Sequence, residues 1–194
     1  MNTKKIFGTG LVVALMVLMV APIAFGQQHP EILDNQWFKV TASLKGYEIT
    51  GDTVLGKGTI GGTVYLHTTY NTGIYTITTC TQDKHDDNVW HKIDTNTISI
   101  VDIYGATYPQ VWDFGDKPVV FSDGPDTYSA YPTLYTKITV DPKGNLKSAS
   151  ISTVSCSVRG ELDNGNYITG SCTLKGSFIP ATQVTKKVPS GCFP

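Results

Sequence analysis

The chain has 194 residues, 16% of them charged, and a formal net charge of −1 at neutral pH. The sequence shows no run or stripe of Lys and Arg, and this disfavours nucleic acids and anionic membranes, which both bind clustered basic residues. A chain of this length suits one domain with a substantial hydrophobic core.

The first 26 residues have the layout of a secretory signal peptide. Two lysines precede an apolar stretch at residues 6–20, and small residues close the segment at Ala24 and Gly26. An uncleaved membrane anchor is the alternative, since the stretch is nearly long enough to span a bilayer, but Pro22 breaks the helix near its end.

We therefore expect cleavage after residue 26 and a single all-β domain over residues 27–194. No second apolar run reaches spanning length, so we expect no stable membrane span after cleavage. The sequence thus predicts a secreted or periplasmic protein.

Apolar and polar residues alternate along the mature chain with the period of a half-buried strand, and no convincing helix is found. Turn signals separate these stretches. The expected strands lie near residues 38–44, 60–66, 110–114, 119–122, 133–140, 146–160 and 166–178. The turn signals are Asn71-Thr72-Gly73, Asp94-Thr95-Asn96, residues 141–145 and Asp163-Asn164-Gly165. This rhythm is typical of an antiparallel, meander-rich barrel or of a two-sheet sandwich.

The last hairpin predicts one cysteine pair. With a three-residue loop at 163–165, Leu162 faces Asn166, and counting outward places Cys156 opposite Cys172. Both sulfurs then lie on an apolar face. That face would also carry Val154, Val158, Ile168 and Leu174. Ile151 has the other parity, so we expect a bulge near residues 152–153.

Cys80 then pairs with Cys192 by elimination, which ties an early strand to the C-terminal tail. Disulfides persist in an oxidising compartment, in agreement with export. The alternative is that one or both pairs stay reduced.

The hairpin at residues 71–73 is expected to have a three-residue loop as well. His67 would then face Ile77, and Tyr65 would face Thr79. Such a hairpin would be apolar on both faces, so it would be covered, line a cavity or meet a partner.

Aromatic residues crowd the region from 104 to 131 and could form a stacking platform for a sugar or another flat ligand. The alternative is ordinary packing of aromatic side chains in a sheet. The candidate ligand-binding residues are Tyr104, Tyr108, Trp112, Tyr128 and Tyr131.

Two groups of side chains could bind metal ions. Imidazoles and carboxylates at close spacing suit a divalent transition metal, although a solvated loop is the plainer interpretation. These residues are His85, Asp86, Asp87 and His91. Four further carboxylates could bind calcium, or simply cap turns. These are Asp113, Asp116, Asp123 and Asp126.

No motif for catalysis or for a cofactor is present. The sequence has no Gly-x-Ser-x-Gly elbow, no His-Glu-x-x-His and no phosphate-binding loop before a helix. Gly56, Gly58, Gly61 and Gly62 lie in or beside an expected strand, where they suit a bulge or tight coiling of the sheet.

The plan of the chain is similar to that of small secreted barrels of the lipocalin or calycin type. An early strand opens with Asp34-Asn35-Gln36-Trp37, meander hairpins follow, and a disulfide ties the tail back. The glycine that this group carries two residues before the tryptophan is Asn35 here. The resemblance is one of architecture and implies no binding residues.

We expect a non-catalytic exported domain that binds a small molecule, a glycan or another extended ligand, or a protein of the cell envelope. The first alternative is a subunit of an extracellular assembly that uses exposed sheet edges and the free segment of residues 27–35 for strand addition. The second alternative is a hydrolase with a site in residues 104–131.

Overall fold

The computed structural model describes residues 30–71, 74–86, 89–102 and 108–193. The predicted signal peptide lies outside these ranges. The described chain is mostly β strand. Its elements are η1 (Pro30–Leu33), β1 (Gln36–Thr50), β2 (Thr53–Asn71), β3 (Ile74–Gln82), β4 (Trp90–Asp102), β5 (Tyr108–Asp113), β6 (Val119–Asp123), β7 (Asp126–Val140), β8 (Leu146–Glu161), β9 (Tyr167–Ile179), α1 (Ala181–Lys187) and η2 (Ser190–Cys192).

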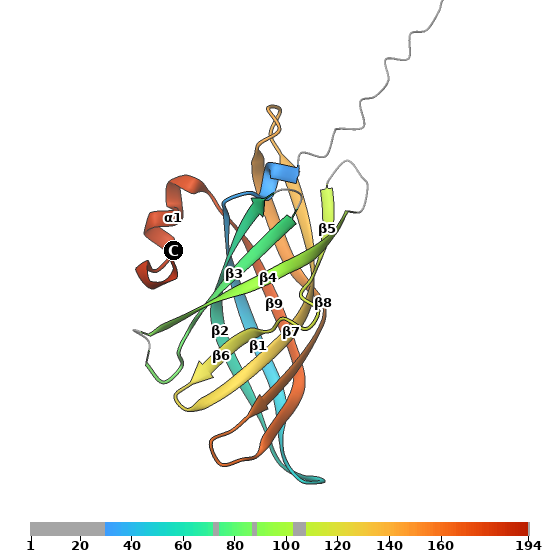
Figure 1. Cartoon of the computed structure of the whole chain (residues 1–194), viewed down its shortest axis with the longest axis vertical. Helices are drawn as coiled ribbons and strands as arrows, with labels where there is room; N and C mark the ends of the chain where they lie inside the picture. The colour runs from blue at the N-terminus through green and yellow to red at the C-terminus, as the bar shows by residue number, and fades with distance from the viewer. Residues whose placement is uncertain (1–29, 72–73, 87–88, 103–107, 194) are drawn as a thin grey trace, which may run out of the picture.

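All the strand pairings in the described residues are antiparallel and belong to one sheet (Figure 1). The strand order is β5-β4-β3-β2-β1-β9-β8-β7-β6, and β5 also pairs with β7. The prediction of an antiparallel all-β fold is therefore confirmed, and so is the meander of the last three strands. The expectation of no helix is wrong, because α1 forms after β9.

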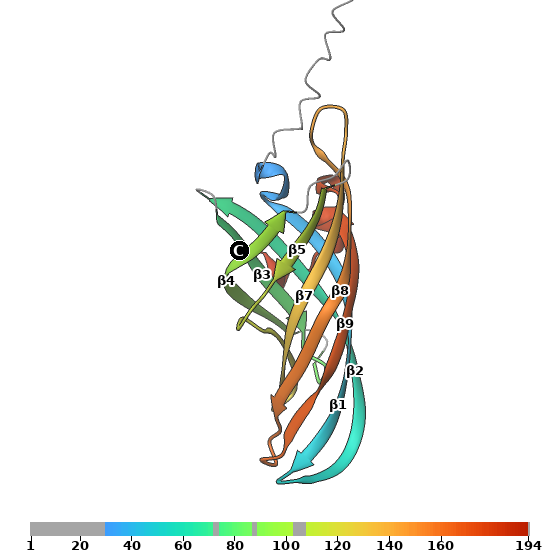
Figure 2. The same cartoon turned by 90° about the vertical axis from the view of Figure 1, so that its right-hand side faces the viewer.

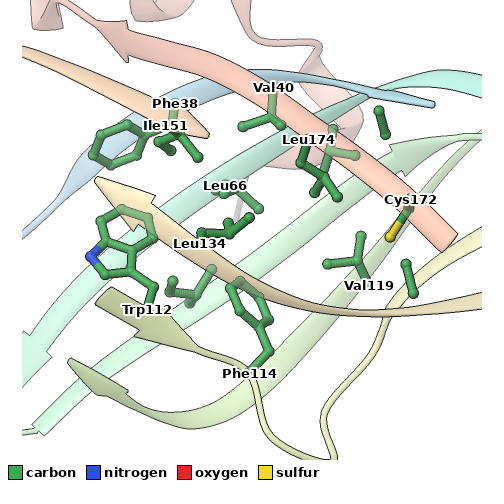
Figure 3. Packing of buried hydrophobic residues seen from close by; sticks show 14 of the residues in the cluster. Phe38, Val40, Leu66, Trp112, Phe114, Val119, Leu134, Ile151, Cys172 and Leu174 are labelled. Atoms are coloured by element: carbon green, nitrogen blue, oxygen red, sulfur yellow. The ribbon is translucent and has the colours of Figure 1, made fainter. Parts of the chain in front are cut away.

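One face of the sheet encloses a single apolar core. Along β1 the side chains of Phe38, Val40, Ala42 and Leu44 are buried, whereas the residues between them are largely exposed. Phe38 meets Trp112 of β5 edge to face, with ring centroids 5.2 Å apart. Figure 3 shows these side chains together with those of the strands around them. The fully buried side chains of largest volume also include Phe114, Phe121, Leu33, Leu66, Ile77, Leu134, Ile138 and Leu174.

The predicted register of the β8–β9 hairpin is confirmed. Leu162 donates its N–H to the Asn166 carbonyl at 2.8 Å, and Gly165 adopts a positive φ of 78°. Cys156 and Cys172 are paired, with Cα atoms 5.1 Å apart. The hairpin turn thus sets the position of the disulfide, as the sequence predicted.

The expected bulge is present between Ser152 and Ser157 of β8. Within it the Thr153 hydroxyl accepts the Leu174 N–H at 2.6 Å and donates to the Leu174 carbonyl at 3.0 Å. A side chain therefore replaces the missing backbone partner. Because the bulge changes the parity of the strand, Val154 is 61% exposed, and its predicted place on the apolar face is wrong.

The predicted register of the β2–β3 hairpin is wrong by one residue. Asn71 faces Ile74, which leaves two residues between the strands, so Thr68 faces Ile77 and Tyr65 faces Cys80. A shift of one residue moves every side chain to the other face. Ile77 therefore shares the inner face with Leu66, and Cys80 shares the outer face with Tyr65.

The turn expected at residues 94–96 is also wrong, because β4 runs through it. Opposite Thr76 and Ile77 the register of β4 skips one residue, from Thr97 to Thr95. Polar residues that suit a turn form a bulge here, which the sequence pattern alone does not distinguish from a turn.

Two glycines of β9 allow the sheet to coil tightly against β1. A Cβ atom on Gly170 would lie 2.0 Å from the Lys45 carbonyl oxygen, and one on Gly176 would lie 2.3 Å from that of Lys39. Both obstacles are backbone atoms, which cannot rotate away. Only glycine permits this approach of the two strands.

The Thr153 hydroxyl offers a direct test of the bulge. We expect Thr153→Val to lower the free energy of unfolding by about 1–3 kcal/mol, because it leaves the Leu174 N–H without its acceptor. Chemical denaturation measures this. Thr173→Val, at an exposed position on β9, is the control and should change stability by less than about 0.5 kcal/mol. Equal effects of the two substitutions would contradict the role of Thr153.

Candidate functional site

The segment before β1 covers one end of the sheet. Leu33 of η1 is fully buried in the main core, and its carbonyl accepts a hydrogen bond from the Thr68 hydroxyl. The Asp34 carboxylate accepts the Tyr70 N–H at 2.7 Å. Residues 30–35 are thus docked on the sheet. The assembly hypothesis had supposed that they form a free arm. Residues 27–29 lie outside the described residues.

A second apolar cluster lies on the outer face and is covered by the C-terminal segment. Trp37 of β1 and Tyr65 of β2 are 5% exposed, although they point away from the main core. Val188 and Cys192 from the tail pack against them, and Phe193 lies with its ring centroid 5.4 Å from that of Trp37. Figure 1 shows α1 and the C-terminus beside the strands on this side.

Cys80 and Cys192 hold this cover in place. Their Cα atoms lie 5.6 Å apart, and both cysteines are buried. The pairing predicted by elimination is therefore the one that the structure brings together. The aromatic cluster beneath the tail thereby has a structural role.

His67 belongs to the same cluster. Its ring stacks on Trp37 with centroids 4.4 Å apart, and its Nε2 lies 2.9 Å from the Asn35 side-chain oxygen. Burial lowers the pKa of His67. The Asp34 carboxylate acts in the opposite direction, and Lys92 adds to the lowering.

The β3–β4 loop is organised by one buried carboxylate, that of Asp83. Its Oδ1 accepts the backbone N–H groups of His85 at 2.7 Å, and of Asp86 and Gly124 at 3.3 Å, whereas its Oδ2 lies 3.0 Å from His91 Nε2. The hydrogen bond with His91 holds the pKa of Asp83 well below its usual range, and the N–H of His85 adds to this. Asp83 therefore ties the loop to the β6–β7 turn.

The predicted transition-metal residues are placed only in part. His85 and Asp86 are exposed, and His91 pairs with Asp83. Asp87 lies outside the described residues. Within the described ranges no three His, Cys, Asp or Glu side chains gather to bind a metal ion. Asp113, Asp116, Asp123 and Asp126, proposed for calcium, lie in or beside turns, where Asp113 accepts the Gly115 N–H at 3.0 Å.

The structure places two of the five predicted stacking residues inside the main core. Trp112 and Tyr128 are buried in the main core, which matches the alternative of ordinary packing. Burial raises the pKa of Tyr128 to about 12, with smaller contributions from Asp126 and Asp123. Tyr131 is half-buried on the other face of β7. Tyr104 lies outside the described residues, as does the side chain of Tyr108.

The outer face of five neighbouring strands carries a regular array of polar side chains. Cross-strand pairing aligns β7, β8, β9, β1 and β2, and Figure 2 shows these strands side by side. From β7 to β2 the rows are Lys137, Ser150, Ser177, Lys39, Tyr65; then Tyr135, Ser152, Lys175, Thr41, Thr63; then Thr133, Ser155, Thr173, Ser43, Gly61; then Tyr131, Ser157, Ser171, Lys45, Thr59; then Ser129, Arg159, Thr169, Tyr47, Lys57. In the third row Ser155 and Thr173 are not a ladder pair, because the bulge of β8 interrupts the β8–β9 pairing there. The second and fourth rows are paired across all five strands. We call this array the hydroxyl–lysine face.

Apart from Gly61, every residue of this face bears a hydroxyl, an ammonium or a guanidinium group, and none is acidic. None of its cations forms an ion pair with a residue that the structure describes. The Lys39 ammonium instead lies 6.0 Å from the centre of the Tyr65 ring. Glu161 lies one row beyond the face, opposite Tyr167. Apart from Tyr65, which the C-terminal tail covers, the face is therefore an exposed to half-buried, positively charged surface rich in hydrogen-bonding groups.

A hollow of about 670 Å³ adjoins one end of this face. Gly46, Gly58 and Gly170 line it together with five members of the face. Those members are Lys45, Tyr47, Lys57, Thr59 and Ser171. Gly58, Gly46 and Gly170 are cross-strand neighbours on β2, β1 and β9, at positions with the inward parity of Leu44.

The chain matches no known protein-family model, and a search of curated proteins finds no match. Within the described residues no helix is long and apolar enough to cross a membrane. The assignment of function therefore depends on the surfaces described above.

Sequence reasoning missed the hydroxyl–lysine face, although its parts were visible. The alternation along each strand already separated Lys39, Thr41 and Ser43 from their buried neighbours. What joins the cations of five strands on one surface is the strand order, in which β1 pairs with β9 rather than only with β2. No local pattern in the sequence predicts that pairing.

The two disulfides should differ in their contribution to stability. Cys80 and Cys192 are 112 residues apart, and Cys156 and Cys172 are 16 apart. In the chain-entropy model the long loop corresponds to about 4.7 kcal/mol and the short one to about 3 kcal/mol. We expect the Cys80→Ser, Cys192→Ser variant to lose more unfolding free energy than the Cys156→Ser, Cys172→Ser variant. The opposite order in chemical denaturation would contradict this.

The buried imidazole predicts a dependence of stability on pH. The folded-state pKa of His67 lies below its ordinary value of 6.5. As pH falls through about 6.5, the unfolded chain binds a proton before the folded one does, so the contribution of neutral His67 is lost below that pH. We expect His67→Gln to reduce the loss of unfolding free energy between about pH 7.5 and pH 5.5. His85→Gln, at an exposed position, should leave the loss as in the wild type.

Proposed function

We propose that the protein is an exported, non-catalytic binding module that holds an extended ligand on its outer surface, at the hydroxyl–lysine face. The observation that carries this proposal is the composition of that face. A surface of exposed hydroxyl and cationic groups without counter-charges offers many hydrogen bonds and an unsatisfied charge to a ligand.

The main core supports an external rather than an internal ligand. Trp112, Phe38, Phe114 and Phe121 fill the space between the strands, together with aliphatic side chains from almost every strand. A carrier barrel of the lipocalin type keeps such a space open for its ligand. The ligand of this chain is therefore proposed to lie outside.

We further propose that the sheet forms a barrel rather than a two-sheet sandwich. In support, β5 pairs with β4 on one side and with β7 on the other, and one cluster includes side chains from strands at both ends of the strand order. A sandwich would divide these strands between two sheets. The two disulfides and the docked tail would keep such a barrel rigid outside the cell.

The alternatives receive less support. For strand addition, residues 30–35 are docked, and the outer edge of β6 accepts hydrogen bonds from the Thr81 hydroxyl at 2.7 Å and from the Lys84 N–H at 2.9 Å. For a hydrolase in residues 104–131, the described aromatics are largely core residues and Asp113 caps a turn. Both remain hypotheses from the sequence.

A pair of bulky, uncharged substitutions tests whether the face binds. We expect Thr41→Tyr with Thr173→Tyr to reduce binding to the cell-envelope fraction of the producing organism at least about fivefold, because the rings obstruct the middle of the face. Co-sedimentation of the purified mature protein measures this. Circular dichroism and thermal unfolding verify the fold of each variant.

Gln183→Tyr on α1 provides the matched control, since it adds the same side chain at an exposed position outside the rows of the face. Its binding should stay within about twofold of the wild type. If the folded double variant sediments with the envelope as well as the wild type does, the face is not the binding surface and the proposal fails.

A further inference from the structure

We propose that the ligand of the hydroxyl–lysine face is an acidic polysaccharide, with carboxylate or sulfate groups on its sugars. This inference rests on the proposed function and names the chemistry of the ligand. It is argued from the placement of the cations, from the groups between them and from the exposed rings on the same side.

Four of the six cations of the face form two pairs, and Lys137 and Arg159 stand apart. Lys45 faces Thr59 and Lys57 faces Tyr47, so the two lysines are diagonal neighbours on adjacent strands, about 7–8 Å apart at the backbone. Lys39 and Lys175 stand in the same relation on β1 and β9. Each pair can meet one or two anionic groups, and hydroxyl groups occupy the positions between the pairs.

The hydroxyl groups suit the uncharged part of a sugar chain. Neighbouring strands lie about 4.8 Å apart, so a chain that crosses them meets a new column of Ser, Thr or Tyr hydroxyls at each step. A hydroxyl both donates and accepts hydrogen bonds, as sugar hydroxyls do. Lysines alone would provide only donors.

Exposed tyrosine rings on the same side provide apolar surface for sugar rings. Tyr47 is 52% exposed, Tyr135 is 36% exposed, and Tyr167, just beyond the last row, is 59% exposed. Tyr47 also lines the hollow between Lys45 and Lys57. An aromatic ring beside two cations matches a sugar that carries an acidic group.

Two other polyanions fit the face less well. The bulge of β8 exposes one aliphatic side chain beside the face, that of Val154, which is too little to enter a lipid bilayer. The cations of the face are separated by hydroxyls, whereas a nucleic acid carries a charge at every step of its backbone. Asp83, Asp86, Asp123 and Asp126 are in or beside the β3–β4 loop and the β6–β7 turn, outside the rows of the face, and Glu161 lies one row beyond it.

Binding of the mature protein to polygalacturonate tests the proposal, with neutral dextran, phosphatidylglycerol vesicles and duplex DNA as comparison probes. Isothermal titration gives the dissociation constants. We expect binding to polygalacturonate, none to dextran, and binding to vesicles and DNA at least about tenfold weaker. The polysaccharide should be recovered at its original chain length. Dissociation constants for vesicles or DNA equal to that for polygalacturonate would overturn the assignment.

Matched charge variants test the site. The triple substitution Lys45→Gln, Lys57→Gln and Lys175→Gln should raise the dissociation constant at least about fivefold and reduce its salt dependence, because exposed charge contacts are screened by salt. The triple substitution Lys143→Gln, Lys186→Gln and Lys187→Gln removes the same charge from the β7–β8 turn and from α1. It should change the constant by less than about twofold.

Equal weakening by the two triple variants would show long-range attraction alone and would overturn the site. If polygalacturonate does not bind while the bulky face substitutions still abolish binding to the envelope, the ligand class is wrong and the binding face stands. If neither ligand depends on the face, both proposals fail.

Discussion

The inward and outward alternation of side chains along β1 is the constraint on which the rest of the structure depends. β1 pairs with β2 on one side and with β9 on the other, so its two faces set the two faces of the sheet. Its inward residues, Phe38 to Leu44, anchor the core, and its outward residues supply the hydroxyls and lysines of the exposed surface. A slip of one residue in this strand would exchange the two sets, which makes the register strongly specified.

The two faces of the sheet have different tasks. The inner face is filled with aromatic and aliphatic side chains and is the source of stability, because burial of apolar surface is the main favourable term in folding. The outer face is divided by the C-terminal tail. Near Trp37 the tail covers an apolar cluster, and away from it the sheet is left polar and open. The division leaves most of the outer surface available for recognition.

Local signals in the sequence predicted much of this fold. The turn at 163–165 fixed a hairpin register, and through it a cysteine pair and a bulge, since each follows from counting along two strands. The same reasoning failed at residues 71–73, where a loop shorter by one residue reverses the faces of β3. The helix α1 was missed because its seven residues are too few to show a helical period. The hydroxyl–lysine face was missed for another reason, since it exists only once distant strands pair.

The bond between Cys80 and Cys192 also gives the chain an unusual connectivity. It makes a covalent ring that contains every strand from β4 to β9, with the smaller ring of Cys156 and Cys172 inside it. A protease that cuts once in an exposed turn of this ring, such as the one between β7 and β8, opens the ring and releases no fragment. A nicked molecule would keep its strands, its core and its exposed face together for as long as the bond remains oxidised.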